Sequence, residues 1–389
     1  MKKIISATLI CATTSLVAMQ AEEAYLYKDA RIMGMGGTNI AVGGYSTSLF
    51  SNPAGIARIK KEDGFVVEVL GLGLDATAQV TDFADDMSNA IDTEQIEDLT
   101  AVLEKYNGEH FHQGFSNYSS LSKNSDLFAW SVGLLVAEDA NFMTHVSGCE
   151  IGLECIETTS RGYGGLMFAG AKTFDTTVGQ VDVGVGFKYV AQVSYEGLVS
   201  AIDLVDDNIS SDELRNQYEQ QSSGFGIDLG VNYHPVGNSY GHPVVALSVM
   251  NIGTINMDDN YGGQPMTVNL GFAVTPEVQY IEKLTLAVDY VDIFGANKQR
   301  EYTSETDYID HNTYDFIKKL RLGVGVCLVE NQWVYTQLNF GLYQGGLTAG
   351  FDLLASVIKI NLATYEEQVG TGSVDISDRR YMAQFGVAW

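Results

Sequence analysis

The chain has 389 residues, of which 46% are hydrophobic, 41 are glycine and only five are proline. Its formal net charge of −27 makes nucleic acid and anionic lipid poor partners, because the electrostatic field of the protein repels both. The length accommodates two ordinary domains or one long barrel, and no Pro- or Ser-rich linker divides the chain.

Residues 1–21 have the pattern of a cleaved secretory signal. Lys2 and Lys3 form a basic start, a short and mostly apolar run follows, and Ala21 completes a small-residue cleavage site. The run is too short and too rich in Ser and Thr for a membrane-anchoring helix. Cys11 lacks the small preceding residue that a lipidated cysteine requires. We therefore expect export from the cytoplasm, and no later apolar run is long enough to predict a transmembrane helix.

Residues 30–59 are rich in glycine and contain an Asn-Pro-Ala-Gly turn. A dinucleotide-binding loop requires a strand before the glycines, a helix after them and an acidic residue about twenty positions later. Here the glycines follow a secretory signal and lead into Asn52-Pro53, which disfavours nucleotide binding. Glycine permits close approach of two backbones, and Asn-Pro imposes an extended residue followed by a turn. The stretch therefore predicts tight packing rather than phosphate binding.

From Gly64 onward, apolar and polar residues alternate with the period of two that is typical of half-buried β-strands. In residues 181–187, for example, Val and Phe occupy every second position, with Asp and Gly between them. We predict fourteen strands, at residues 64–78, 110–121, 125–138, 160–174, 178–196, 221–234, 242–254, 266–275, 281–294, 316–329, 331–343, 345–354, 355–366 and 378–389.

The connections between these strands alternate between long and short. Only the connection at residue 344, which should be long, breaks the rule. An up-and-down membrane barrel has this asymmetry, with tight periplasmic turns and long external loops, and its strands are about ten residues long. A soluble Greek-key sandwich would also alternate along each strand but would not sort its loops in this way. The pattern predicts an all-β, antiparallel transmembrane barrel of about fourteen strands, with all of its long loops outside.

Two of the long external loops contain predicted helices. Residues 93–106 read as an amphipathic helix with Thr93 as its N-cap, and residues 210–221 as a second, weaker one. We expect these helices to fold down over the mouth of the barrel, and the alternative is that they hold a partner protein.

The last strand predicts an insertion signal. Tyr381, Phe385, Val387 and the terminal Trp389 lie on one face of an amphipathic strand. A terminal aromatic residue in such a strand resembles the signal by which the barrel-assembly machinery recognises outer-membrane barrels. The alternative is an ordinary edge strand that happens to end in Trp.

Two cysteines suggest a disulfide. Cys149 and Cys155 lie in one predicted external loop of an exported chain, where the oxidising compartment favours a bridge. The bridge would close a short loop and so stabilise that loop more than the barrel. Cys327 is expected to point inward as a free, buried thiol, because its neighbours face outward.

We predict no metal, cofactor or catalytic site. His110 and His112 would share one strand face, as metal ligands can, but no third ligand follows at a fixed spacing. We therefore expect them to be solvated histidines at the base of a loop. The acidic stretches 206–208 and 258–260 do not match a calcium-binding loop and are expected to be solvated. No nucleophile–base pair or acid–base pair of carboxylates is evident.

The whole layout resembles the FadL/PorV class of outer-membrane barrels, and within it the TraF-like conjugal transfer proteins. The resemblance rests on "ARIMGMGGTNIAV", on "LFSNPAGIA" soon after it, on the fourteen strands and on the terminal aromatic residue. It implies that the N-terminal segment folds inside the barrel as a hatch, with a motif formed by Gly34, Gly36, Gly37, Asn52, Pro53 and Ala54. Glycines at inward strand positions would thin the wall where the hatch presses; these are Gly184, Gly186, Gly224, Gly226, Gly230, Gly323 and Gly325.

The resemblance divides the chain into a signal peptide (residues 1–21), a hatch (22–63) and a barrel (64–389). It implies a passive channel for small hydrophobic molecules in the outer membrane of a Gram-negative bacterium. The alternative is a barrel whose loops bind protein partners in a secretion or conjugal-transfer system. The chain lacks further motifs of the long-chain fatty-acid transporters, so no substrate follows, and it has no C-x-x-C of the thioredoxin-like proteins that share the TraF name.

Overall fold

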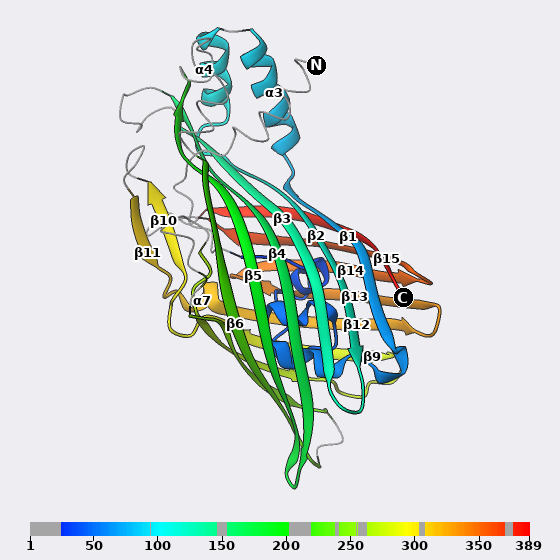
Figure 1. Cartoon of the computed structure of the whole chain (residues 1–389). Helices are drawn as coiled ribbons and strands as arrows, with labels where there is room; N and C mark the ends of the chain where they lie inside the picture. Colours follow the sequence, from blue (N-terminus) through cyan, green and yellow to red (C-terminus); the bar gives the residue numbers. More distant parts are fainter. Residues whose placement is uncertain are drawn as a thin grey trace.

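The computed structural model describes residues 25–93, 95–145, 154–201, 219–237, 241–253, 255, 263–302, 308–369 and 376–389. Fourteen strands close into one antiparallel barrel, in which β1 pairs with both β2 and β16 (Figure 1). The predicted fold class is confirmed. No helix in the described residues is both long and apolar enough to cross a membrane.

The barrel strands follow the predicted order. They are β1 (Phe65–Thr77), β2 (His110–Asn124), β3 (Ala129–His145), β4 (Cys155–Thr176), β5 (Gly179–Ser200), β6 (Glu219–Pro235), β7 (Val244–Ile252), β8 (Thr267–Val274), β9 (Lys283–Tyr290), β12 (Leu320–Glu330), β13 (Val334–Tyr343), β14 (Gly346–Ala355), β15 (Ile358–Gln368) and β16 (Ser377–Ala388). Each predicted strand has a counterpart, and the differences lie at the strand ends.

The outer face of the wall is apolar and the inner face is polar. In β6, Leu229 and Val231 are exposed, whereas Asp228 and Asn232 on either side of them are buried. The same alternation places Leu134 and Val136 outside in β3. Exposed apolar side chains in this number are unfavourable in water and favourable in the hydrocarbon of a bilayer. The outer face is therefore the lipid-facing surface.

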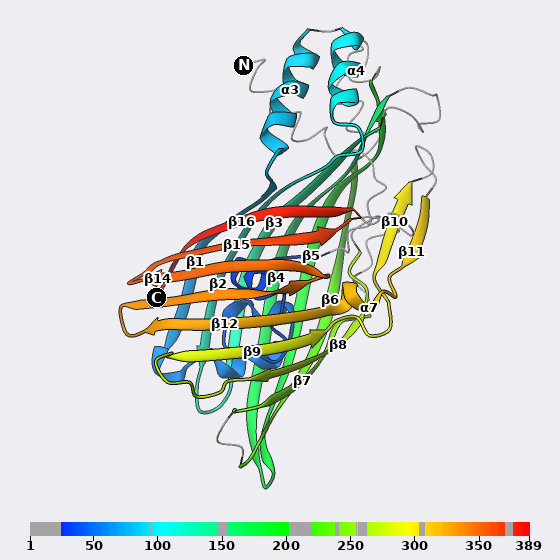
Figure 2. The same ribbon diagram turned by 180° about the vertical axis from the view of Figure 1, so that it is seen from behind.

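The strands on one side of the barrel are much longer than a bilayer requires. β4 and β5 each have 22 residues, whereas β8 and β9 have eight. About ten residues of a tilted strand span the hydrocarbon core. Figures 1 and 2 show β2 to β6 rising together above the rest of the wall. The upper parts of these strands therefore stand outside the bilayer.

Two helices cover this extension of the wall, α3 (Val80–Asp92) and α4 (Ile96–Lys105). Phe83 of α3 stacks on Phe111 of β2, with 4.3 Å between ring centroids, and Leu103 of α4 joins the same cluster as Phe142 of β3. Phe142 is an even number of positions from the exposed Leu134, so it points to the outer face. The helices thus pack on the outer side of the extended strands and do not close the barrel mouth, which corrects the expectation from sequence.

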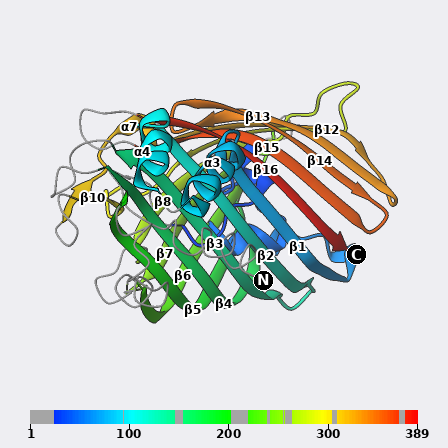
Figure 3. The same ribbon diagram turned by 90° about the horizontal axis from the view of Figure 1, so that it is seen from above.

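The sequence located α4 but missed α3 and misplaced the helix start. Thr93 does not cap α4, whose N-cap is Gln95; its hydroxyl instead donates to the carbonyl of Ala90 at the end of α3. Figure 3 shows the helix pair from above. The second predicted helix, at residues 210–221, falls almost entirely outside the described residues, and Glu219 already begins β6.

The long connection between β9 and β12 contains structure that the alternation pattern did not predict. Its strands β10 (Lys298–Tyr302) and β11 (Tyr308–Asn312) form a small separate sheet. The short helix α7 (Phe316–Lys319) then leads into β12. These five-residue strands are too short to show a clear period of two.

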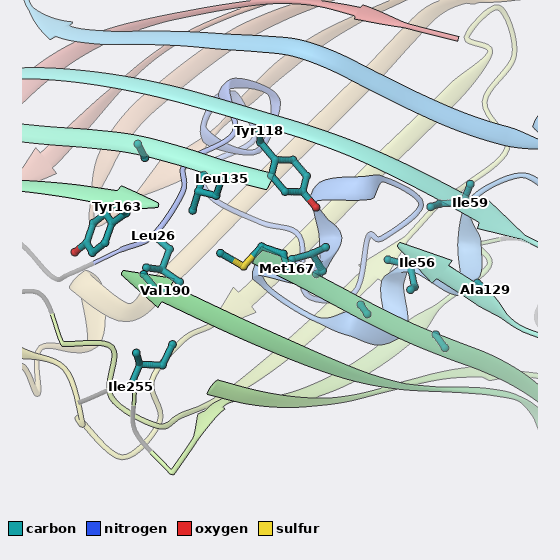
Figure 4. Close-up of a cluster of buried hydrophobic side chains, with 14 of the residues drawn as sticks. Leu26, Ile56, Ile59, Tyr118, Ala129, Leu135, Tyr163, Met167, Val190 and Ile255 are labelled. Carbon is teal, nitrogen blue, oxygen red and sulfur yellow. The ribbon is translucent and has the colours of Figure 1, made fainter. Parts of the chain in front are cut away.

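The N-terminal segment, residues 25–64, begins inside the barrel. It contains α2 (Ala30–Gly34) and the 3-10 helices η1 (Ser46–Phe50), η2 (Pro53–Arg58) and η3 (Lys61–Asp63). Figure 1 shows the helical turns of this segment, coloured blue, surrounded by the wall. Leu26 and Ile56 of the segment share a buried cluster with wall residues such as Tyr118, Leu135 and Met167 (Figure 4). The main apolar core therefore lies between this segment and the wall.

A charge on the outer face should destabilise the barrel according to its depth. We expect Leu229→Arg, in mid-strand of β6, to cost about 2–4 kcal/mol, and Val236→Arg, just beyond the end of the same strand, about 0–1 kcal/mol. Urea unfolding of the protein in lipid vesicles measures both. Equal costs at the two positions would contradict a lipid-facing wall. A substitution of Asp228 on the inner face would not serve as a neutral control, because Asp228 is buried and pairs with Lys188 Nζ at 3.0 Å, so its loss would itself destabilise the wall.

Candidate functional site

The glycines of the N-terminal segment lie directly against the wall. Gly36 has φ +67°, and a Cβ built on it would lie 2.1 Å from the carbonyl oxygen of Leu322 in β12. A Cβ on Gly34 would lie 2.8 Å from the Cα of Gly350 in β14, and one on Gly37 would meet the Tyr343 ring at 2.8 Å. A side chain at Gly36 would be both strained and obstructed. These glycines therefore permit backbone-to-backbone packing.

The Asn-Pro-Ala turn is held by one side chain. Asn52 Oδ1 accepts a hydrogen bond from the amide of Ala54 at 3.0 Å, and Pro53 is the first residue of η2. Asn52 Nδ2 donates to the Ile40 carbonyl at 2.8 Å and to Asn232 Oδ1 of β6 at 2.7 Å. The turn is thereby fixed both to its own segment and to the wall.

The wall makes room for this turn with glycine. A Cβ on Gly184 of β5 would lie 2.3 Å from the Ala54 nitrogen, and one on Gly230 of β6 would lie 1.9 Å from Asn52 Oδ1. A Cβ on Gly323 would lie 2.1 Å from Thr38 Oγ1 of the N-terminal segment. A Cβ on Gly186 or Gly226 would instead meet Asp228 or Ile255, which are not part of that segment. Some inward glycines thus face the N-terminal segment, and others do not.

Buried charges also tie the segment to the wall. Asp289 Oδ2 of β9 accepts hydrogen bonds from the amides of Asn39 and Ile40 at 2.7 and 2.9 Å. Lys28 Nζ lies 2.7 Å from Glu367 Oε2 of β15. Arg58 contacts Asp182 of β5 with Nε 2.6 Å from Oδ2. The sequence did not predict these pairs, because each joins residues more than a hundred positions apart and leaves no local pattern.

Within the segment, Asp29 organises the first helix. Its carboxylate caps α2 by accepting from the Arg31 amide at 2.9 Å, and it accepts from Thr47 Oγ1 at 2.8 Å. Burial by itself would raise the pKa of Asp29, but the Arg31 guanidinium, Lys359 and these hydrogen bonds hold it below its usual value. Asp29 therefore remains ionised as part of a buried pair.

A cavity of ≈ 250 Å³ lies between this segment and the wall. Its apolar lining includes Tyr25, Tyr27, Met33, Phe50 and Met250. Its polar lining includes Lys188, Asn251, Asn269, Asp292 and Arg321. A second, more open cavity of ≈ 770 Å³ is lined by Arg58 at the end of η2 and by the tight turns next to Gly179 and Pro235. The segment thus lines a small cavity within the barrel and a larger one at the end with the short turns.

The two strand histidines are neither solvated nor part of a metal site. His112 is fully buried, with Nδ1 2.7 Å from Asn141 Oδ1 and 3.3 Å from Asp139 Oδ1. His110 Nδ1 lies 3.1 Å from Asp378 Oδ2. The described residues contain no group of side chains that could hold a metal ion. The expectation of solvated histidines was wrong, because β2 carries both side chains inward to carboxylates on other strands, β3 and β16.

These histidines belong to a buried polar network on the inner wall. Asp139 also contacts the guanidinium of Arg161, which is fully buried. Asp378 pairs with Arg380 at 2.7 Å, and Arg380 reaches Asn141 at 3.3 Å. The network joins β2, β3 and β4 to β16 across the point where the barrel closes at β1.

The remaining predictions concern the cysteines, the acidic stretches and the C-terminal strand. Cys327 is buried and free, as predicted. Cys155 begins β4, but Cys149 lies outside the described residues, so their disulfide stays a prediction, and the acidic stretches at 206–208 and 258–260 also lie outside. Tyr381, Phe385 and Trp389 are exposed on the outer face, and the Trp389 amide donates to the Val67 carbonyl at 3.1 Å. Together with Val387 they remain a predicted insertion signal.

Comparison with solved structures shows the same fold in two hydrocarbon transporters. The Ralstonia pickettii toluene transporter TbuX is 13% identical, with 94% of this chain and 99% of that chain covered and a TM-score of 0.56. For the Pseudomonas putida toluene transporter TodX the identity is 13%, the coverage 95% and 99%, and the TM-score 0.50. A Pseudomonas aeruginosa FadL homologue matches at 9% identity, with 95% and 99% coverage and a TM-score of 0.48. No curated protein matches the chain significantly.

A family model identifies the chain more closely than these structures do. The model described as "F plasmid transfer operon, TraF, protein" matches residues 49–337, which is more than half of the chain. The match includes Asn52, Pro53 and Ala54 but begins after Gly34, Gly36 and Gly37. The resemblance inferred from the sequence is thus confirmed, and the chain belongs to this TraF family of proteins.

Proposed function

We propose that the protein is an outer-membrane channel through which small, mainly apolar molecules pass by binding and diffusion, with residues 25–64 as a hatch. The observation that carries this proposal is the cavity of ≈ 250 Å³ between that segment and the wall. A pocket that combines aromatic side chains with a few polar groups is the usual form of a small-molecule site.

The location follows from the surface and the ends of the chain. The apolar outer face suits a bilayer, and a closed barrel leaves no unpaired backbone edge within it. The predicted secretory signal and the terminal aromatic strand direct such a chain to the outer membrane of a Gram-negative cell.

The substrate class is suggested by the aromatic rings at the cavity. Tyr25, Tyr27, Phe50 and Tyr343 contribute to its lining. Tyr27 and Phe50 pack together, with 4.9 Å between ring centroids. TbuX and TodX, which share the fold, are toluene transporters. Rings of this kind favour a flat apolar ligand through offset or edge contacts.

Uptake by intact cells tests this function, since the lipopolysaccharide leaflet is then the barrier. Cells that contain the protein should take up radiolabelled toluene faster than cells without it. Met250→Trp, which fills the cavity from β7, should remove most of that difference. Val245→Trp, on the exposed face of the same strand, should leave it intact. Both variants are first checked for heat-modifiable gel migration, which reports a folded barrel.

The alternative function is a scaffold whose external part binds a protein. It is favoured by the wall extension of β2 to β6 with its helix pair, which stands beyond the bilayer and outside the channel mouth (Figure 1). A scaffold would leave uptake the same with and without the protein, and the cavity variant would have no effect. That outcome would replace the channel proposal.

A further inference from the structure

One cation at the cavity differs from the others in its partners. Lys28 pairs with Glu367 at 2.7 Å, and Lys188 with Asp228 at 3.0 Å. Arg321 of β12 also lines the cavity and is only 3% exposed, yet it makes no ion pair with any residue in the described part of the chain. A guanidinium stays protonated in proteins, so Arg321 carries its charge into a buried site.

The described contacts of Arg321 hold it in place, and none of them is an ion pair. Its Nη1 donates to the carbonyls of Lys318 and Leu320, and its guanidinium carbon lies 4.0 Å from the centroid of the Tyr343 ring. Its Nε and Nη2 make no hydrogen bond to a described residue. The Arg321 side chain is thus positioned through Nη1, and its Nε and Nη2 remain available to donate hydrogen bonds to a ligand.

The carboxylate across the sheet from Arg321 is bound to other groups. Asp289 lies directly opposite Arg321 in the β9–β12 ladder. Its carboxylate accepts hydrogen bonds from the amides of Asn39 and Ile40 and makes no ion pair with Arg321, although the Arg321 charge still acts on it through space. The hydrogen bonds from the hatch therefore hold this carboxylate away from a direct ion pair with the arginine.

We propose that the cavity binds a small molecule that has one carboxylate and an apolar body of about one aromatic ring, with the carboxylate against Arg321. The proposal rests on the channel function and narrows its substrate class. A guanidinium donates two parallel hydrogen bonds to a carboxylate, and such charged bonds are strong where water is scarce. The adjacent Tyr343 ring and the apolar side of the cavity receive the ring, and a volume of ≈ 250 Å³ disfavours larger ligands.

Binding of two probes of similar size, one charged and one neutral, separates the effect of the ligand's charge from that of its shape. The purified full chain in detergent is titrated calorimetrically with benzoate and with neutral benzyl alcohol. We expect benzoate to bind more tightly, and Arg321→Gln to weaken benzoate by about tenfold or more, as the loss of a charged hydrogen bond predicts. The affinity for benzyl alcohol should change by less than about twofold, because the apolar contacts are retained.

The control is Arg379→Gln, which removes an arginine that is partly exposed on β16 and pairs with Glu366. It should leave both affinities unchanged. If the wild-type chain bound benzyl alcohol as well as benzoate, or if Arg321→Gln weakened both equally, the carboxylate site would be wrong while the channel could stand. If it bound neither probe, the site would also be wrong, and the toluene uptake assay would decide separately whether the channel proposal fails as well.

Discussion

Deleting residues 25–57 should convert a barrel with a blocked lumen into one that conducts ions. The fourteen strands close the wall through their own backbone hydrogen bonds, so insertion does not require the segment. Its removal exposes Asp289 and Glu367 on the inner wall, whereas Arg58, the partner of Asp182, is retained. Because the emptied lumen fills with water, these carboxylates become hydrated rather than stranded. We expect a stable, open pore in planar bilayers where the intact chain shows little conductance.

A single substitution should act in the same direction. Gly36→Val places a branched side chain 2.1 Å from the Leu322 carbonyl at a backbone φ of +67°, so the segment must shift away from β12. Gly108→Val is the matched control, because Gly108 has φ +77° but a Cβ added there would meet no atom within 4 Å. Raised conductance in the first variant and not in the second would tie the effect to packing in the lumen. Closed behaviour of the deletion would show that the segment does not block the pore.

Breaking the buried network should be the most destabilising change in the wall. Asp139→Ala removes the carboxylate that contacts the fully buried Arg161 and lies beside His112. Removing one partner from a buried ion pair costs about 3–5 kcal/mol. We expect a loss of this size in the free energy of unfolding, measured by urea titration in lipid vesicles.

Two further variants test the physical cause. Lys105→Ala breaks the exposed pair with Asp86 on the helix pair and should change the free energy of unfolding far less, because water screens an exposed ion pair. The double variant Asp139→Leu with Arg161→Met removes both charges and should recover most of the loss, because apolar residues replace a buried pair without leaving a charge behind. A cost for Asp139→Ala no larger than that for Lys105→Ala would contradict the network's importance.

For the helix pair, the sequence pattern predicted a buried face, but only the structure shows the surface on which that face packs. The apolar stripe of α4 was readable, since Leu99 and Leu103 recur at helical spacing. The stripe says that one face is buried but not against which surface. That choice depended on the length of β2 to β4, whose outer faces extend beyond the bilayer and would otherwise expose Phe111 and Phe142 to water.

The expectation that His110 and His112 are solvated was wrong for the same reason. Their spacing correctly placed both on one strand face, but their partners Asp139 and Asp378 come from other strands. Partners this distant in sequence leave no spacing rule to read. Arg321 is a similar case, because nothing in its neighbourhood in the sequence reveals that Asp289 accepts hydrogen bonds from the N-terminal segment.

By itself, the sequence determined the barrel, its fourteen strands, the two faces of its wall and the Asn-Pro turn, because strand period and turn chemistry are properties of neighbouring residues. The tertiary structure alone decided which wall glycines meet the N-terminal segment, which buried charges are paired and where a cavity remains. Those features arise when a closed wall brings residues hundreds of positions apart within hydrogen-bonding distance, and the cost of burying each charge then depends on what it meets there.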